Sequence, residues 1–142
     1  MEEYIFADGV FVGKDILTIY EGLYLLESRK IKVYDKYGKE LDITDILTED
    51  LKKRYIVYKF LKERNIIFGA GMKFGGTFRV YENPGDDHSK WICFPVYKNE
   101  KFTIYEFLAK NRVAHSTRKT LLISIVDKDK IRKFLEIKWK KL

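Results

Sequence analysis

The segment "WICFPVYKNEKFTIYEFLAKNRVAHSTRKTLLISIV", Trp91 to Val126, predicts a strand, a helix and a second strand in succession. Residues 91–97 are apolar at nearly every position, which indicates a strand covered on both faces. Residues 120–126, "TLLISIV", have the same character. The stretch between them, 102–114, gives the clearest helical signal in the chain. The segment therefore predicts a sheet whose central strands are buried against a helix.

Local signals fix the start of that helix. Thr103 and Glu106 have the spacing of a capping box, and Phe102 and Phe107 are placed to form a hydrophobic staple. Cys93 is the single cysteine, so no internal disulfide can form within one chain. Because it lies within an apolar run, we expect it to fill the core rather than to react.

Two further strands extend this unit on either side. In "TFRVYE", 77–82, alternation places Phe78 and Val80 on one face and Tyr81, with Arg79, on the other. After the turn "DKDK", apolar residues alternate along a last strand that ends near Trp139. Glycines between 69 and 76, including Gly75 and Gly76, are expected to bend the chain between short strands.

The first part of the chain predicts a separate, smaller unit. Residues 4–12 indicate a hairpin around Asp8-Gly9, 16–30 a short helix with Ile16 on its apolar face, and 31–42 a strand with a turn at Tyr37-Gly38. A helix over 48–65 follows, with an apolar stripe of Leu51, Tyr55, Tyr58 and Leu61. The predicted fold is α/β (α+β): a small N-terminal α/β domain, 1–49, and a larger C-terminal domain, 50–142, with a mixed sheet and flanking helices.

Charge divides the chain at the same place. Residues 1–49 hold 6 Lys and Arg against 11 Asp and Glu, a net charge of −5. Residues 50–142 hold 22 against 10, a net charge of +12, within a total of +7. Such a basic domain indicates a polyanionic partner, although a solvated Lys-rich surface explains the charge about equally well. No signal peptide and no 18-residue apolar run is visible, so we expect a cytoplasmic protein without a membrane partner.

Several common catalytic and ligand-binding motifs are missing from the sequence. Cys/His clusters typical of zinc sites, a Gly-x-Ser-x-Gly element and a phosphate-binding loop are all missing from the sequence. Asp86, Asp87 and His88 in the loop "NPGDDHSKW" are a weak metal candidate, because adjacent acids in a turn are usually solvated. We expect no metal and no other cofactor.

Tyr, His and Lys side chains in a basic domain suit a different reaction. RNA carries its own nucleophile, the 2′-hydroxyl beside each phosphate. Its cleavage needs a base for that hydroxyl, an acid for the departing 5′-oxygen and a cation for the charge of the transition state. Histidine is a natural acid near neutral pH, lysine supplies a point charge, and a tyrosine is a base only where nearby cations lower its pKa of about 10.

The order of the motifs "YEGLYLLE", "RYIVYKFLKERN", "GMKFGGTFRVYE", an acidic loop with His, "NRVAHSTRKTLL" and "IVDKDK" resembles the archaeal tRNA-splicing endonuclease (tRNA-intron lyase) family, from about Ile16 to the C-terminus. The resemblance implies a metal-independent ribonuclease with Tyr81 as general base, His88 as general acid and Lys119 stabilising the transition-state charge. It also implies cleavage of precursor tRNA at bulge-helix-bulge motifs, leaving a 2′,3′-cyclic phosphate and a 5′-hydroxyl.

The same resemblance suggests contacts with RNA. Arg112 matches an arginine that clamps a bulged base by stacking, and Arg132 or Lys133 is the candidate for the second clamping cation. His115 and Ser116 are expected to position a phosphate or to serve the structure. Without the resemblance, the sequence hardly separates His115 from His88 as the catalytic histidine.

Assembly is implied as well, because two cleavage sites require two active sites at a fixed distance, as in a two-fold symmetric oligomer. Asp127 and Asp129 occupy the position of an acidic loop that contacts another subunit. Lys128 and Lys130 dilute that charge, and the first domain is short. Both features favour a heterotetramer with a paralogous structural subunit, while a homo-oligomer stays open. The alternative functions are a non-catalytic RNA-binding subunit and a metal-dependent DNA nuclease.

Overall fold

A computed structural model describes residues 1–71 and 77–142. The chain forms two compact units, Met1–Tyr55 and Ile56–Leu142, each with its own sheet. The helix α3 (Glu49–Glu63) runs through the division, whereas the sequence places a domain boundary just before this helix. The predicted bends at Gly75 and Gly76 lie outside the described residues.

The first unit contains a five-stranded sheet in the order β3-β2-β1-β4-β5. Its elements are β1 (Glu2–Ala7), β2 (Val10–Val12), β3 (Ile16–Leu17), α1 (Ile19–Glu27), β4 (Ile31–Tyr34), β5 (Glu40–Leu41) and α2 (Ile43–Ile46), followed by the first part of α3. The predicted hairpin is confirmed: Ala7 pairs with Val10, and Asp8 and Gly9 both have positive φ, at 52° and 77°. Two successive positive φ angles are what a tight hairpin turn requires.

The prediction for Ile16 was wrong. Ile16 lies in β3, paired with Val12, and its side chain is 71% exposed. The physical reason is local, because Thr18 caps the helix and its hydroxyl accepts a hydrogen bond from the Glu21 N–H. A helix capped at Thr18 begins at Ile19, which leaves the two preceding residues free to pair as a strand.

The long helix α3 agrees with its predicted stripe. Leu51, Tyr55, Tyr58 and Leu61 are all buried. The Thr48 hydroxyl accepts from the Leu51 N–H at 3.2 Å and caps the start. Within the first unit Tyr55 donates to Glu27, and within the second the Tyr58 ring packs edge-on against Phe68. None of the helices within residues 1–71 and 77–142 is long and apolar enough to cross a membrane.

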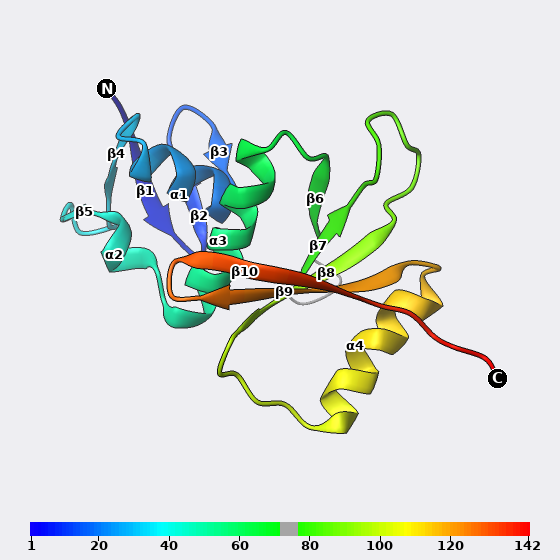
Figure 1. Ribbon diagram of the computed structural model, residues 1–142. Helices are drawn as coiled ribbons and strands as arrows, with labels where there is room; N and C mark the ends of the chain where they lie inside the picture. Colours follow the sequence, from blue (N-terminus) through cyan, green and yellow to red (C-terminus); the bar gives the residue numbers. More distant parts are fainter. Residues whose placement is uncertain (72–76) are drawn as a thin grey trace. The chain divides into compact units, whose positions relative to one another are not determined.

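The second unit contains a five-stranded mixed sheet in the order β10-β9-β8-β7-β6 (Figure 1). Its strands are β6 (Phe68–Gly71), β7 (Thr77–Val80), β8 (Trp91–Tyr97), β9 (Thr120–Asp127) and β10 (Lys130–Ile137). The two strands of the opening segment, β8 and β9, run parallel, and the other neighbouring pairs are antiparallel. A parallel pair needs a crossover connection, and α4 (Ile104–Ser116) supplies it.

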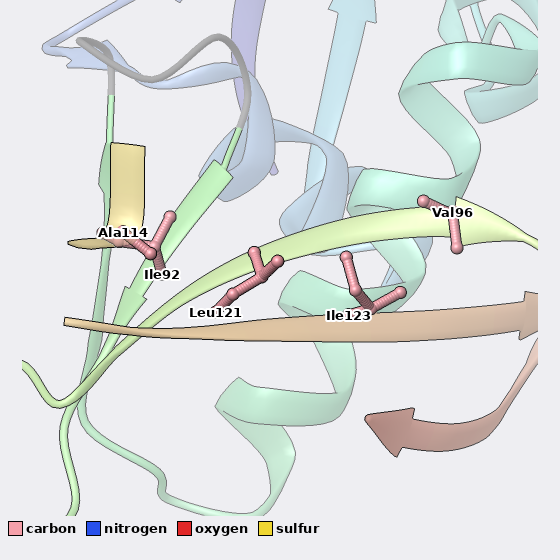
Figure 2. Packing of buried hydrophobic residues seen from close by; sticks show 5 residues of the cluster. All are labelled: Ile92, Val96, Ala114, Leu121 and Ile123. Carbon is pink, nitrogen blue, oxygen red and sulfur yellow. The ribbon is translucent and has the colours of Figure 1, made fainter. Parts of the chain in front are cut away.

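One face of this sheet is covered by α4. A buried cluster joins the helix to β8 and β9 through Ile92, Val96, Ala114, Leu121 and Ile123 (Figure 2). Thr103 caps the helix by accepting from the Glu106 N–H, and the rings of Phe102 and Phe107 lie stacked with centroids 6.3 Å apart. The predicted strand–helix–strand segment is therefore confirmed, including its cap and its staple.

Cys93 is fully buried in β8, and burial raises the pKa of its thiol to about 12. We expect a water-soluble thiol reagent to leave Cys93 unmodified in the folded protein, because the reactive thiolate does not form there. Complete modification should follow unfolding in guanidinium chloride. Absorbance measured during the reaction checks this, and rapid labelling under native conditions would contradict it.

Candidate active site

Tyr81 stands directly after β7. Phe78 and Val80 are buried and Arg79 is exposed, as alternation predicts, whereas Tyr81 is half-buried. Its backbone N–H donates to the Ile67 carbonyl at 3.0 Å, so the pairing of β7 with the chain before β6 continues past Val80. This backbone bond fixes where the tyrosine leaves the sheet.

The loop that follows Tyr81 closes on Lys90. The Lys90 N–H donates to the Val80 carbonyl at 2.9 Å, and its carbonyl accepts from the Thr120 N–H at 2.9 Å. One residue therefore ties the end of β7 to the start of β9. Because Val80 precedes Tyr81 and Thr120 follows Lys119, these bonds bring two predicted catalytic residues to the same end of the sheet.

Hydrogen bonds shape the interior of this loop. The Asn83 N–H donates to an Asp86 carboxylate oxygen at 3.0 Å, and the Asp86 N–H donates to the Asn83 carbonyl at 3.3 Å. Gly85 is the third residue of this turn, with φ of +89°, a conformation that favours glycine. Asp86 thus holds the turn. In the described part of the chain, no group of three or more His, Cys, Asp or Glu side chains is arranged to hold a metal ion.

His88 is exposed in the loop. The Lys119 side chain contacts the loop backbone at the residue that follows His88. The Lys119 ammonium donates to the carbonyl of Ser89, the residue after His88, at 2.9 Å, and Ser89 is buried. The Lys119 N–H donates to the Ala114 carbonyl at 2.8 Å, and Arg118 before it has φ of +60°. The structure therefore gathers Tyr81, the His88 loop and Lys119 at adjoining strand ends.

The base of the loop also carries a row of charged contacts. Lys90 donates to Glu82 at 3.1 Å, and its ammonium lies 4.9 Å from the centroid of the Trp91 ring. The Trp91 indole N–H donates to Glu136 at 2.6 Å, and this bond, with the nearby Lys138 ammonium, lowers the pKa of the Glu136 carboxyl. Glu136 is therefore ionised at neutral pH and links β10 to β8 across β9.

The predicted RNA contacts on α4 share its C-terminal part. Arg112, His115 and Ser116 are exposed there, and the Ser116 hydroxyl donates to the Val113 carbonyl at 3.1 Å. The His115 ring packs edge-on against Trp139, with centroids 5.5 Å apart, and Trp139 is 57% exposed. Because residues three apart on a helix are neighbours, Arg112 and Trp139 both lie next to His115.

Arg132 and Lys133 lie near the start of β10, away from the C-terminal part of α4. Lys133 pairs with Ile125, whereas Ile137 pairs with Leu121, so the start of β10 lies far from Lys119. Thr120 and Ile125 are five positions apart along the strand, which corresponds to about 16 Å. Arg132 also forms an ion pair with Asp127 at 3.4 Å. The structure brings Trp139, and neither of these cations, to the end of β10 near Lys119.

Trp139 was not among the predicted site residues. It was assigned to the apolar alternation of the last strand, but β10 ends at Ile137 and Trp139 lies beyond it. The run "KWKK", 138–141, holds an exposed aromatic ring among lysines, a composition typical of surfaces that bind single-stranded nucleic acid. The sequence therefore contained a signal that could have identified Trp139 as a candidate RNA-binding residue.

The predicted subunit contact lies at the turn between β9 and β10. Lys128 has φ of +58° in this two-residue connection. The Asp127 carboxylate lies 3.4 Å from Arg132 and 3.8 Å from Lys98. Asp129 is exposed. Asp127 is therefore already part of a small ion-pair group within this chain.

Comparison with known proteins gives a consistent result. Residues 51–133 match the family described as tRNA intron endonuclease, catalytic C-terminal domain. The chain is 42% identical to the tRNA-splicing endonuclease of Nanoarchaeum equitans (strain Kin4-M), over 97% of each chain. It is 38% identical to that of Thermococcus onnurineus (strain NA1), over 91% of this chain and 78% of the relative, and 32% identical to that of Saccharolobus islandicus (strain L.S.2.15 / Lassen #1), over 98% and 89%.

Proposed function

The chain belongs to the tRNA-splicing endonuclease family, and from that premise we propose how it acts on precursor tRNA. It cuts introns at bulge-helix-bulge motifs and leaves a 2′,3′-cyclic phosphate and a 5′-hydroxyl, with no metal ion or other cofactor in the reaction. The observation that carries the proposal is the placement of Tyr81, the His88 loop and Lys119 at adjoining strand ends, joined through the backbone of Lys90.

Each of the three side chains has one role in the proposed step. Tyr81, as a phenolate, takes the proton of the 2′-hydroxyl, and the 2′-oxygen forms a bond to phosphorus. The bond from phosphorus to the 5′-oxygen breaks, and the His88 imidazolium donates its proton to that oxygen. Lys119 stabilises the negative charge of the transition state. Its ammonium has three N–H donors, and one bonds the Ser89 carbonyl, so two remain for phosphate oxygens.

Cleavage in excess EDTA tests this function. We expect the protein, alone or with its partner subunit, to release exons with cyclic phosphate ends from an intron-containing precursor tRNA. Binding without release of exons would instead indicate a non-catalytic RNA-binding subunit. Cleavage that EDTA abolishes, or that prefers duplex DNA, would indicate a metal-dependent nuclease.

We propose that Trp139 is the stacking partner that acts with Arg112 on an unpaired base. A planar guanidinium and an indole ring both stack well on nucleobases. Trp139 is exposed and lies against His115, three residues from Arg112, whereas Arg132 is paired with Asp127 at the other end of β10.

Replacing Trp139 by Ala should weaken binding of a bulged RNA by about 5- to 150-fold, because stacking on one aromatic ring contributes roughly 1–3 kcal/mol. Trp139→Phe should retain most of the affinity. Filter binding or fluorescence anisotropy at fixed salt measures the effect. Arg132→Ala is the matched control and should change affinity less than threefold; the reverse order of the two variants would contradict the assignment.

We also propose that the chain works in a two-fold symmetric oligomer, either with copies of itself or in a heterotetramer with a paralogous structural subunit. The polyanionic substrate suits the +12 charge of residues 50–142, and Asp127 and Asp129 are the proposed subunit contact. The native mass of the particle, measured alone and after co-expression with host proteins, separates the two arrangements.

A further inference from the structure

A hollow of about 550 Å³ lies beside Tyr81 within the second unit. Phe60 of α3, Leu122 of β9 and Phe134 of β10 form part of its wall. Leu122 points away from α4, because its neighbours Leu121 and Ile123 belong to the core under that helix and side chains alternate along a strand. The hollow therefore lies on the other face of the sheet, with Tyr81 at its edge. The function proposed above assigns no group of the RNA to this hollow.

The chemistry of the wall argues against a phosphate. Among the described residues that line the hollow, none is Lys or Arg. Two carboxylates line it, those of Glu82 and Glu136, and each accepts a hydrogen bond, from Lys90 and from Trp91 respectively. Further lone pairs of these carboxylates stay available as acceptors. Flat apolar walls with acceptors at the edge suit a planar heterocycle that carries amino groups, such as a nucleobase.

The position of Tyr81 indicates which base of the RNA would enter the hollow. In the proposed step Tyr81 takes the proton of the 2′-hydroxyl on the nucleotide at the 5′ side of the scissile phosphate. In a ribonucleotide the 2′-hydroxyl and the base are attached to neighbouring carbons of the sugar. When Tyr81 contacts that hydroxyl, the attached base must lie within a few bond lengths of the tyrosine, and the hollow is the adjoining space.

We infer that this hollow receives the base of the nucleotide on the 5′ side of the scissile phosphate, packed against Phe134 and Trp91 and next to Tyr81 at the edge of the hollow. The inference rests on the proposed function, because it uses Tyr81 as the group that contacts the 2′-hydroxyl. It deepens that function by adding a second base-binding site, distinct from the exposed surface of Arg112 and Trp139 on the α4 side.

The test compares two bulged RNAs that differ only in this nucleotide, one intact and one abasic with its 2′-hydroxyl kept. With the unmodified protein, loss of the base should weaken binding or slow single-turnover cleavage by about 5- to 150-fold, the range for one stacked base. Ile67, on the wall of the hollow, is 47% exposed, so Ile67→Trp should fill the space without disturbing the core. With this variant the two RNAs should differ less than twofold. Ile67→Phe, a smaller filling, should give an intermediate difference.

Ile104→Trp makes the same change at a site on α4 that is 76% exposed, and this control should keep the full difference between the RNAs. Equal behaviour of both RNAs with the unmodified protein would overturn the inference, as would a full difference with a folded Ile67→Trp variant. A change in native mass caused by Ile67→Trp, with base dependence unchanged, would assign the hollow to a partner subunit. If no RNA is cut but binding still depends on the base, the proposed function fails while the base site stands.

Discussion

His88→Ala is expected to slow single-turnover cleavage of a bulged precursor tRNA by about 100-fold or more, the usual contribution of a general acid. Binding of the RNA should change less than twofold. His88 is exposed and, within the described residues, its side chain forms no hydrogen bond, ion pair or ring contact, so the variant should fold normally. Cleavage under saturating enzyme, with binding measured separately, checks both expectations.

A modified substrate isolates the role of the acid. If sulfur replaces the 5′-oxygen at the scissile bond, the leaving group no longer needs a proton. The His88→Ala protein should then recover most of the rate of the unmodified protein. His115→Ala is the control, because His115 packs on Trp139 and should affect binding more than chemistry. Near-normal cleavage of ordinary RNA by His88→Ala would remove His88 from the mechanism.

Lys119→Met should also slow cleavage strongly, by about 100- to 1000-fold, because it removes the charge proposed to stabilise the transition state. The sulfur-substituted RNA should not rescue this variant, since the missing group is a cation and not an acid. The same single-turnover measurement gives both results. Lys130→Gln, at the far end of β10, is the control and should leave the rate within twofold.

Lys119 could affect the rate in two ways, through its charge or through its hydrogen bond to the His88 loop, and the two effects must be separated. Its ammonium anchors the His88 loop through the Ser89 carbonyl. Lys119→Gln keeps an N–H donor for that carbonyl but has no charge. If the charge is what matters, Gln should be nearly as slow as Met. If Gln retained most of the rate, Lys119 would be a positioning residue for the loop rather than a catalytic one.

Local signals predicted the elements of the second unit well. The apolar runs of β8 and β9, the cap at Thr103 and the staple of Phe102 with Phe107 all agree with the structure. Each depends on residues within about four positions of one another, and such interactions act in the same way in every fold. The identities of Tyr81, His88 and Lys119 as candidates likewise came from local motifs and their order.

One prediction, the helical placement of Ile16, was wrong because two local signals competed, and the positions of two predicted RNA-contact residues depend on strand register. Ile16 fits the apolar face of a helix, but the cap at Thr18 starts that helix later. Arg132 and Lys133 are basic and lie in the last strand, but the pairing of Lys133 with Ile125 puts them far from Lys119. A shift of a few residues in the register of β10 would have brought these cations close to Lys119. No local sequence pattern fixes that register.

By itself, the sequence determined which segments form strands and helices, the basic character of the second part, and the set of side chains suited to cutting RNA. Only the tertiary structure decided that the backbone of Lys90 joins the ends of β7 and β9, that Lys119 bonds the loop of His88, and that Trp139 reaches His115. The physical reason is separation along the chain: Ser89 and Lys119 are 30 positions apart, and their contact exists only once the parallel pair of β8 and β9 has formed.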